Sequence, residues 1–143
     1  MTGASLAGPE EQAALLALRR QVFVDEQGVP ADLERDDQDA GAVHAVARDA
    51  AGQVVGTGRL LVGRAGTARI GRMAVAAQAR GCGVGASLLA VLEEAALAAG
   101  CRRCEVHAQV QAVGFYRRAG YRQEGAAFLE AAIAHLAMVK HLS

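Results

Sequence analysis

The sequence predicts an α/β fold with a mixed, mostly antiparallel twisted sheet of about six or seven strands and flanking helices. Three strand-like segments, separated by short turns that contain glycine, follow one another in the first half of the chain. An amphipathic helical segment and a further strand come next, and this strand–helix–strand spacing favours a right-handed parallel crossover. Two more strand-like segments close the chain.

The N-terminal region is expected to be helical. The Pro-Glu-Glu sequence at residues 9–11 suits the first turn of a helix that runs to about residue 24. The apolar stripe of this helix consists of Leu15, Leu16, Leu18, Val22 and Phe23. Residues 1–8 show no strand pattern. Residues 26–41 are polar and interrupted by glycine and proline, which predicts a loop with one short helical turn at residues 31–35.

The remaining elements follow from apolar runs separated by turn residues. The expected antiparallel meander has strands at residues 43–48, 54–62 and 67–76, joined by turns at residues 49–53 and 63–66. The later elements are a helix at residues 86–99 ended by Gly100, a strand at 103–109, a helix at 111–119 ended by Gly120, and strands at 121–128 and 133–142. Neither repeats nor linkers interrupt this order, which indicates a single domain over residues 1–143.

The composition is that of a folded domain. The chain has 143 residues, of which 52% are hydrophobic and 21% are charged, a balance typical of globular proteins. Its 15 basic and 15 acidic residues give a formal net charge of zero, which argues against a nucleic-acid partner. The charge is unevenly spread, because residues 25–39 hold seven acids and one base. That segment could attract a cation, while the rest of the chain favours an anion.

Membrane, disulfide and metal sites are not expected. No apolar stretch approaches the roughly 20 residues of a membrane-spanning helix, and the N-terminus lacks the regions of a secretion signal. Three cysteines do not predict a disulfide framework, so we expect a cytoplasmic protein with no membrane partner; the sequence is compatible with a homodimer. Cys101, Cys104 and His107 have a metal-like spacing, but residues 104 and 107 project to opposite faces of one strand and a fourth ligand is missing.

The loop Arg80-Gly81-Cys82-Gly83-Val84-Gly85 lies between a strand and a helix. Glycines let the backbone approach a ligand, and the free N–H groups at a helix N-terminus bind phosphate or pyrophosphate. Arg80 adds a positive charge and several hydrogen-bond donors. The segment therefore predicts an anion-binding loop, with a tight turn that binds nothing as the simplest alternative.

Two nucleotide sites are competing interpretations of these glycines. Gly81, Gly83 and Ala86 fit the dinucleotide fingerprint, and Glu105 lies near the expected acidic position. That fingerprint requires the strand to enter the glycines directly, whereas residues 77–80 intervene. The nucleotide P-loop requires Lys-Ser or Lys-Thr after the glycines, and neither is present. A dinucleotide-dependent oxidoreductase is therefore disfavoured.

Two motifs resemble those of the GNAT superfamily of N-acetyltransferases. The first is the coenzyme A loop Arg/Gln-x-x-Gly-x-Gly/Ala, matched by Arg80, Gly83 and Gly85. The second is Asn-x-x-Ala-x-x-aromatic-Tyr-x-x-x-Gly-Tyr/Phe, matched, with Gln in place of Asn, by Gln109, Ala112, Phe115, Tyr116, Gly120 and Tyr121. The N-terminal half is similar to a bacterial branch that includes the ElaA-like proteins, in residues 22–27, in the acidic residues 36–39 followed by His44, and in residues 70–75. The resemblance covers nearly the whole chain.

The resemblance implies that acetyl-CoA lies in a gap where the strands at residues 67–76 and 103–109 diverge. Pantetheine would bond to backbone groups near Met73 and Val75, and pyrophosphate would lie on the glycine loop. Gln109 would replace the family's asparagine in bonding the pantetheine amide. The implied contacts with acetyl-CoA are Met73, Ala74, Val75, Arg80, Gly81, Cys82, Gly83, Val84, Gly85, Ala86, Ser87, Gln109, Ala112, Phe115 and Tyr116.

The implied reaction is direct attack of a primary amine, on a small molecule or a peptide, on the thioester in a ternary complex. Tyr116 is the expected proton donor to the departing thiolate, with simple packing as its alternative. Glu26 is the candidate base, with solvent exposure as its alternative, and His107 could relay a proton or be structural. The acids Asp36, Asp37 and Asp39 could hold a cationic acceptor, or could cap turns and face water. A non-catalytic acetyl-CoA sensor is the alternative function, because cofactor binding requires neither Tyr116 nor an amine pocket.

Overall fold

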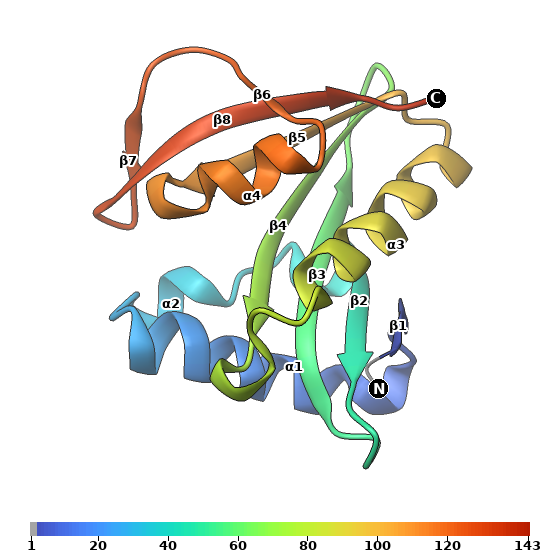
Figure 1. Cartoon of the computed structure of the whole chain (residues 1–143), viewed down its shortest axis with the longest axis vertical. Coiled ribbons are helices and arrows are strands. Elements are labelled where there is room, and N and C mark those ends of the chain that lie inside the picture. The colour runs from blue at the N-terminus through green and yellow to red at the C-terminus, as the bar shows by residue number, and fades with distance from the viewer. Residues whose placement is uncertain (1–2) are drawn as a thin grey trace.

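The computed structural model describes residues 3–143, and its sheet of eight strands has the order β1-β2-β3-β4-β5-β8-β6, with β7 paired to β8 (Figure 1). The strands are β1 Gly3–Leu6, β2 Val43–Arg48, β3 Val54–Val62, β4 Thr67–Val75, β5 Arg103–Gln109, β6 Arg122–Gln123, β7 Phe128–Glu130 and β8 Ile133–His141. The helices are α1 Gln12–Arg19, α2 Ala31–Glu34, α3 Val84–Ala98 and α4 Val113–Arg118. Within these residues every strand pairing is antiparallel except β4 with β5, which confirms the predicted fold class.

The meander of β2, β3 and β4 has the predicted order and pairing. Its first turn is built by Asp49, whose carboxylate accepts hydrogen bonds from the backbone N–H groups of Ala51 and Gln53, at 3.0 and 2.9 Å. Gly52 has a φ of 82° in this turn, a conformation that glycine adopts at little cost. A short acidic side chain and one glycine thus set the hairpin, as the sequence indicated.

Strand β1 is present although residues 1–8 show no strand pattern in the sequence, which left the edge of the sheet undetermined. Gly3–Leu6 pairs antiparallel with β2, from Gly3 opposite Arg48 to Leu6 opposite Ala45. The pattern is absent because this edge strand is held by backbone pairing, whereas its residues are exposed or half-buried and show no apolar alternation. Arg48 also donates a hydrogen bond to the Ser5 hydroxyl at 2.8 Å.

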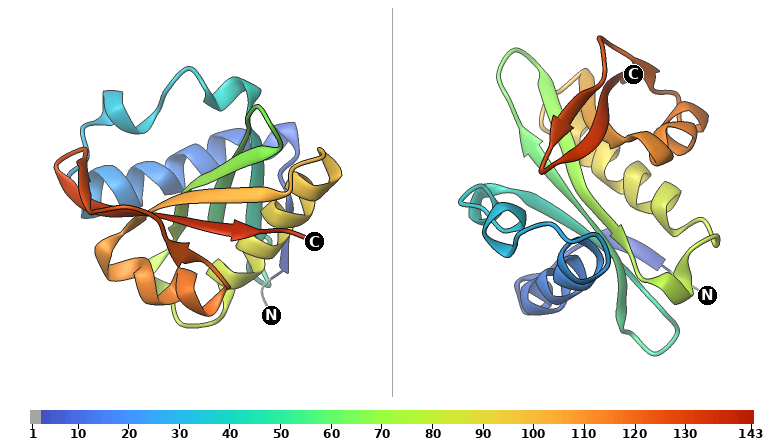
Figure 2. Two further views of the ribbon diagram at one scale, coloured as in Figure 1. Left: turned by 90° about the horizontal axis from the view of Figure 1, so that it is seen from above. Right: turned by 90° about the vertical axis from the view of Figure 1, so that its left-hand side faces the viewer.

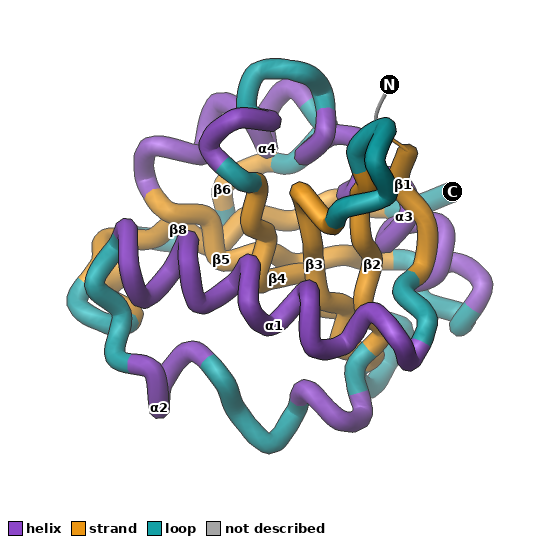
Figure 3. The backbone as a smooth tube through the Cα atoms, turned by 90° about the horizontal axis from the view of Figure 1, so that it is seen from below, coloured by secondary structure: helices purple, strands orange, loops and turns teal. Residues whose placement is uncertain are grey.

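The helices cover the two faces of the sheet. Helices α1 and α2 lie on one face, and α3 and α4 lie on the other (Figure 2, right), with α1 running across the strands (Figure 3). Helix α3 approaches β3 closely because two glycines face it. A Cβ at Gly56 would lie 2.7 Å from a Val84 methyl, and a Cβ at Gly58 would lie 2.7 Å from a Leu92 methyl. Small residues on β3 therefore fix the position of the helix that follows the glycine loop.

Strands β4 and β5 diverge, as the resemblance implied. Their parallel pairing spans four residue pairs, from Thr67–Arg103 to Ile70–Val106. Beyond Ile70 the remaining residues of β4 pair with β3 alone, and β5 continues against β8. The separation is visible in Figure 1, where β4 runs down the view while β5 and β8 run across it. The gap leaves backbone groups of β4 unpaired at the centre of the sheet.

Two predicted elements differ in detail. The helix expected at residues 9–24 runs from Pro9 to Glu26 as a 3₁₀ turn, α1, and a π-helical segment Arg20–Glu26. Turns of this π type often occur at functional sites. The strand expected at residues 121–128 is divided into β6 and β7, because the chain turns at Gly125 with a φ of 90°. With β1, this division gives eight strands rather than six or seven.

Candidate active site

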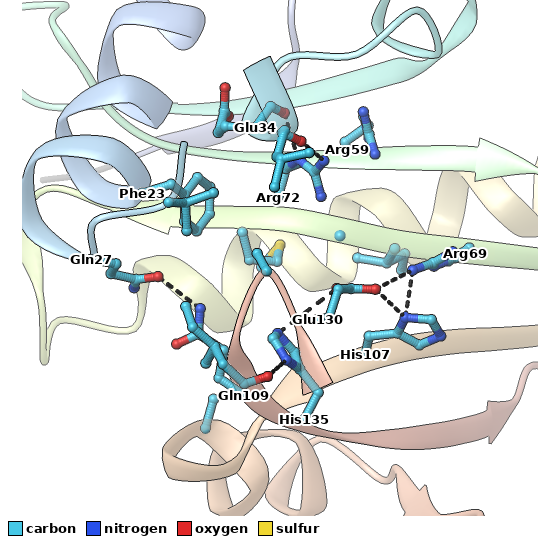
Figure 4. Close-up of a pocket in the computed structure, with 18 of the residues that line it drawn as sticks. Phe23, Gln27, Glu34, Arg59, Arg69, Arg72, His107, Gln109, Glu130 and His135 are labelled. Carbon is cyan, nitrogen blue, oxygen red and sulfur yellow. Dashed lines mark hydrogen bonds and ion pairs between the residues drawn. The ribbon is translucent and has the colours of Figure 1, made fainter. Parts of the chain in front are cut away.

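A cavity of about 700 Å³ opens on the α1/α2 face of the sheet where β4 and β5 diverge (Figure 4). Strands β3 and β4 and the segment around α2 line one side of the cavity. Strands β5, β7 and β8 and the start of α4 line the other side. One continuous space therefore joins Arg80 and Tyr116, predicted for acetyl-CoA, to a separate group of charged side chains around Arg72 and Glu130.

The glycine loop before α3 has the geometry of an anion site. Gly81 and Gly83 both have a φ of 79°, and a Cβ on either would meet nothing within 4 Å, so the constraint is conformational. The first hydrogen bond of the helix is donated by Ser87 N–H to the Gly83 carbonyl, at 3.1 Å. The backbone N–H groups of residues 81–86 have no protein acceptor within the described chain. These free donors at the N-terminus of a 15-residue helix fit a pyrophosphate.

The other residues of the loop contribute unequally. Val84 is buried in the core, so only its backbone can face a ligand, whereas Cys82, Ala86 and Ser87 are exposed. The Ser87 hydroxyl donates to the Gly83 carbonyl at 3.1 Å. Gly85 lets the helix pack closely against Phe115, because a Cβ there would lie 3.2 Å from two of its ring carbons.

Arg80 is held away from the loop by two partners. Its Nε donates to the Val75 carbonyl at 2.9 Å, and its Nη2 donates to both carboxylate oxygens of Glu26, at 2.9 and 3.1 Å. Glu26, the base predicted from the sequence, is thus paired with Arg80 and is absent from the cavity lining. The structure therefore brings Glu26 to Arg80, one of the residues predicted to bind phosphate.

The free edge of β4 presents the backbone of Met73 and Val75. Ala76 N–H donates to the Val55 carbonyl of β3 at 2.8 Å, and backbone groups alternate in direction along a strand. Val75 and Met73 therefore point toward the gap, whereas the predicted contact Ala74 pairs with Thr57 of β3 and is 1% exposed. A bulge between Thr57 and Arg59 adds a residue to β4 at this point.

Tyr116 lines the cavity from α4 and is 7% exposed. Its ring packs edge-on against Phe115 and Tyr121, at centroid distances of 5.0 and 5.7 Å. Burial raises the pKa of the Tyr116 hydroxyl to about 12. The phenol is therefore protonated at neutral pH, as predicted, but it is a weaker acid than an ordinary tyrosine.

Gln109 closes part of the cavity. Its amide nitrogen donates to the Gln27 side-chain oxygen at 2.8 Å, and its own oxygen accepts a hydrogen bond from Gln111 at 2.5 Å (Figure 4). Gln27 follows the π-helical segment, so this bond connects the N-terminal helical region to the end of β5. In this arrangement the Gln109 amide bonds to other side chains, and it must exchange them to bond pantetheine.

A cluster around His107 occupies the C-terminal side of the cavity (Figure 4). His107 Nε2 lies 3.1 Å from Glu105 Oε1, and His107 Nδ1 lies 3.0 Å from Glu130 Oε1 and 2.5 Å from Arg69 Nη2. His135 Nε2 lies 3.8 Å from Glu130 Oε2. Sequence reasoning missed Glu130, whose signal was an isolated carboxylate within an apolar C-terminal stretch.

These partners suit His107 in two protonation states. Neutral His107 with its proton on Nε2 donates to Glu105 and accepts at Nδ1 from Arg69. Charged His107 donates from Nδ1 to Glu130 as well. Burial alone would raise the pKa of Glu130, but the hydrogen bond from His107 and the charges of His107, Arg69 and His135 lower it. Glu130 is thus a carboxylate at neutral pH, ready to stabilise a cation beside it.

Several carboxylates of the acidic segment predicted to bind a cation already form ion pairs with arginines of the protein. Arg19, 1% exposed, donates to Glu34 at 2.5 Å and to Asp39 at 2.7 Å. Arg59 donates to Asp36 and Asp39, at 2.7 and 3.0 Å, and Arg72 lies 3.3 Å from Asp36. Only Asp37 of the three predicted acids is exposed without such a partner in the part of the chain described. Glu34, Asp36 and Asp39 therefore belong to an ion-pair network with three arginines, whereas Asp25, Asp32 and Asp37 remain on the surface.

Residues 3–143 offer neither a membrane-spanning helix nor a metal-binding cluster. In that range no helix combines the length and apolar character needed to cross a membrane. No group of three or more His, Cys, Asp or Glu side chains is arranged to hold a metal ion there. Cys104 lies in the core on the α3 face and His107 lies in the cavity, on opposite faces of β5 as predicted.

Comparison with known proteins identifies the family. The family model described as an acetyltransferase (GNAT) domain matches residues 6–142. The uncharacterized N-acetyltransferase YjcF of Bacillus subtilis (strain 168) is 38% identical over 139 residues, covering 96% of this chain and 98% of that protein. The crystal structure of an acyl-CoA N-acyltransferase from Pseudomonas aeruginosa is 28% identical, with a TM-score of 0.82 over 98% of this chain and 99% of that one. Escherichia coli ElaA, at 24% identity and a TM-score of 0.82 over 98% of each chain, shares the fold. This chain belongs to the GNAT family of N-acetyltransferases.

Proposed function

We propose that the protein transfers the acetyl group of acetyl-CoA to a primary amine by direct attack in a ternary complex. The observation that carries this proposal is the single cavity in the gap between β4 and β5. Its lining includes Arg80, which would reach the pyrophosphate, Gln109 and Tyr116, which would lie near the thioester, and His107 with Glu130, which would face the amine. Because both groups of residues line one space, an amine and a thioester can meet there without a covalent enzyme intermediate.

The residues present fit acetyl-CoA as the acyl donor. The free N–H groups of residues 81–86 would hold the pyrophosphate, with Arg80 supplying charge after it leaves Glu26. The backbone groups of Met73 and Val75 at the edge of β4 would pair with the pantetheine amides as an added strand does. A free N–H on that edge would also stabilise the oxyanion that develops on the thioester carbonyl.

Proton removal from the amine falls to His107 in this proposal. An aliphatic ammonium group has a pKa near 10.4, so it must lose a proton before it can attack. His107 would accept that proton at Nδ1 after Arg69 moves off this nitrogen, while Nε2 keeps its bond to Glu105. Glu130 positions the ring, and its carboxylate stabilises the charged form. Glu26 is a weaker candidate than the sequence indicated, since both of its oxygens are bonded to Arg80.

Tyr116 would stabilise the departing thiolate. With a pKa raised to about 12, its hydroxyl is a poor source of a fully transferred proton for a thiolate, whose own pKa is about 8.5. It is still a hydrogen-bond donor in a site with little water, where such a bond to an anion is strong. The expected role is therefore donation of a hydrogen bond to sulfur as the C–S bond breaks.

The test combines a binding measurement with a search for turnover. Isothermal titration with acetyl-CoA should show stoichiometric binding, and a panel of primary amines should include acceptors that release free coenzyme A. Binding without turnover across the panel would instead identify a non-catalytic acetyl-CoA sensor. Failure to bind acetyl-CoA would contradict the proposed use of the glycine loop.

A further inference from the structure

At Gly71 on β4, neither the backbone conformation nor steric contact with neighbouring atoms demands a glycine. Its φ lies outside the left-handed region, and a Cβ built there would meet nothing within 4 Å. Gly71 pairs with Arg59 of β3, and paired residues of antiparallel strands project to the same face. Both residues line the cavity. The missing side chain therefore leaves space inside the cavity, where a ligand can lie against the strand.

Two different kinds of side chain flank this space at the same level of the sheet. Arg69 pairs with Glu105, so His107, two residues further along β5, lies level with Gly71. Arg59 lies on the opposite side, directly across from Gly71 on β3. With strands about 4.8 Å apart, the Cα atoms of Arg59 and His107 are separated by roughly 10 Å or slightly more, because β5 diverges here. The gap above Gly71 thus has the width of a small molecule. The guanidinium groups of Arg59 and Arg72 lie on one side, and the His107 imidazole lies on the other with Glu130 and Arg69, which contact it.

The arginine side of this gap has unused hydrogen-bond donors. Arg59 is 5% exposed and bonds Asp36 and Asp39 through Nη1 alone, leaving Nε and Nη2 without a protein acceptor within residues 3–143. Arg72 bonds the Glu34 carbonyl through Nε and the Leu33 carbonyl and Asp36 through Nη2, leaving Nη1 without an acceptor in the same range. Both residues line the cavity. Arg59 Nε is buried without a partner in this range, which is uncommon in proteins, whereas the Arg72 side chain is 24% exposed. A planar anion would bond the open donors of both arginines.

Arg72 belongs to the network of arginines and carboxylates described above. Burial lowers the pKa of the Arg72 side chain, and the charges of Arg59 and Arg19 act in the same direction, whereas Asp36 and Glu34 act in the opposite direction. Asp36 remains close enough to both arginines to hold their Nη1 and Nη2 groups in place.

We infer that the acceptor is a small amino acid-type molecule that carries both a primary amine and a carboxylate. Its carboxylate lies against Arg59 and Arg72, its body lies over Gly71, and its amine lies beside His107 and Glu130. Arg59 and Arg72 determine specificity by binding the carboxylate, and Gly71 does so by leaving room for the substrate. This assignment depends on the proposed acetyl transfer and replaces the purely cationic acceptor that the acidic sequence segment suggested.

The first experiment compares acceptors that differ only in the carboxylate. L-phenylalanine, L-leucine and L-lysine are assayed against their amides and their decarboxylated amines by release of coenzyme A. The acid that serves best should exceed its amide and its amine in kcat/KM by roughly 10- to 150-fold, the range for hydrogen bonds to a charged group. Equal or higher rates with the amides and amines would overturn the assignment while leaving acetyl transfer intact.

A second measurement does not need turnover. The protein saturated with coenzyme A is titrated calorimetrically with the N-acetyl forms of the same acids, amides and amines. Tighter binding of at least one carboxylate, by about tenfold or more, supports the anion site even if no amine is acetylated, and in that case the catalytic proposal alone fails. No preference for a carboxylate in either measurement overturns the inference.

Gly71→Val tests the space above β4. Because valine favours strands and its Cβ meets no atom, the melting temperature should be equal to or higher than that of the parent. Acetyl-CoA affinity should be unchanged, while the acceptor KM should rise roughly tenfold or more because the new methyl groups occupy the acceptor's place. The matched control is Gly3→Val in β1, where a Cβ also meets nothing within 4 Å and which lies outside the cavity. If Gly71→Val keeps the parent's acceptor KM and product affinities, the acceptor does not lie over Gly71.

Discussion

Glu26 accepts two hydrogen bonds from Nη2 of Arg80, at 2.9 and 3.1 Å, and so occupies the arginine that would bind pyrophosphate. The pair is well exposed, with 46% of the Arg80 side chain and 36% of the Glu26 side chain accessible. Exposed pairs of this kind contribute about 0–1 kcal/mol. Acetyl-CoA must displace this contact if Arg80 is to reach its phosphates.

The first prediction is that Glu26→Gln tightens acetyl-CoA binding by up to about fivefold at low salt, because it removes the competing carboxylate. The gain should shrink at high salt, and kcat should stay close to that of the parent. Asp25→Asn, which removes a neighbouring exposed charge, is the matched control. A loss of kcat in the range of 10²–10⁴ would instead restore Glu26 as the general base.

Tyr116→Phe keeps the ring and its packing while removing the hydroxyl. Loss of a hydrogen bond to a charged sulfur corresponds to a decrease of roughly 10- to 150-fold in kcat and kcat/KM together, with acetyl-CoA affinity almost unchanged. A larger fall, toward 10⁴, would indicate complete proton transfer. The control is Tyr121→Phe, which removes a hydroxyl bonded to Glu93 at 2.8 Å outside the cavity and should affect stability alone.

His107→Gln should lower kcat/KM for the amine by about 10²–10⁴ at neutral pH, because the positioned base is lost. The remaining activity should increase with pH toward the pKa of the acceptor's own free amine. Glu130→Gln keeps the imidazole but removes the anion that stabilises its charged form, so the acidic limb of the pH–rate profile should move to lower pH. These profiles are measured from pH 5 to 10 with acetyl-CoA saturating. An unchanged profile in both variants would exclude this pair from proton transfer.

Arg19→Met should destabilise the fold by about 3–5 kcal/mol at pH 7, because it leaves Glu34 and Asp39 buried without their main partner. Burial alone would raise the pKa of Asp39, but Arg19, the Asp36 backbone and Arg59 together lower it well below its usual range. In the parent this stabilisation is therefore complete above the ordinary aspartate pKa of about 3.9 and is lost as the pH falls through the lower folded value. The loss of unfolding free energy in Arg19→Met should become smaller toward pH 4, because protonation of Glu34 and Asp39 removes their unpaired charges.

Urea denaturation at pH 7 and near pH 4 measures that difference. The control Arg20→Met changes the exposed neighbour in the chain and should stay within about 0.5 kcal/mol of the parent. If Arg19→Met lowers the free energy of unfolding by the same amount at both pH values, packing of the aliphatic part of Arg19, rather than its charge, stabilises this region.

The sequence predicted elements with local signals and missed those that depend on pairing. The meander and α3 were predictable because glycine turns and an apolar stripe mark them. Strand β1 was not, because it is held at the sheet edge by backbone bonds. The divergence of β4 and β5 came from the family resemblance, since nothing in the residues themselves shows that pairing stops at Ile70.

The candidate site was predictable to a similar extent. Glycines 81 and 83 and Tyr116 stand at motif spacings, and the structure places them at the start of α3 and in the cavity. The partners of charged side chains could not be predicted. Glu26 and Arg80 are 54 residues apart in the chain, and His107 and Glu130 are 23 apart, so only the fold shows that each pair is in contact.

The short pairing of β4 with β5 connects two parts of the sheet that carry different residues of the proposed site. The arginines and glycine of the inferred acceptor site lie before the glycine loop, on β3 and β4, whereas His107, Tyr116 and Glu130 lie after it. Four residue pairs connect these two parts of the sheet beside the gap. Arg69 of β4 also crosses between them, since it reaches His107 and Glu130. If the proposed roles hold, substitutions around Gly71 that spare Arg69 can change which molecule is acetylated while leaving the proposed proton-transfer residues in place.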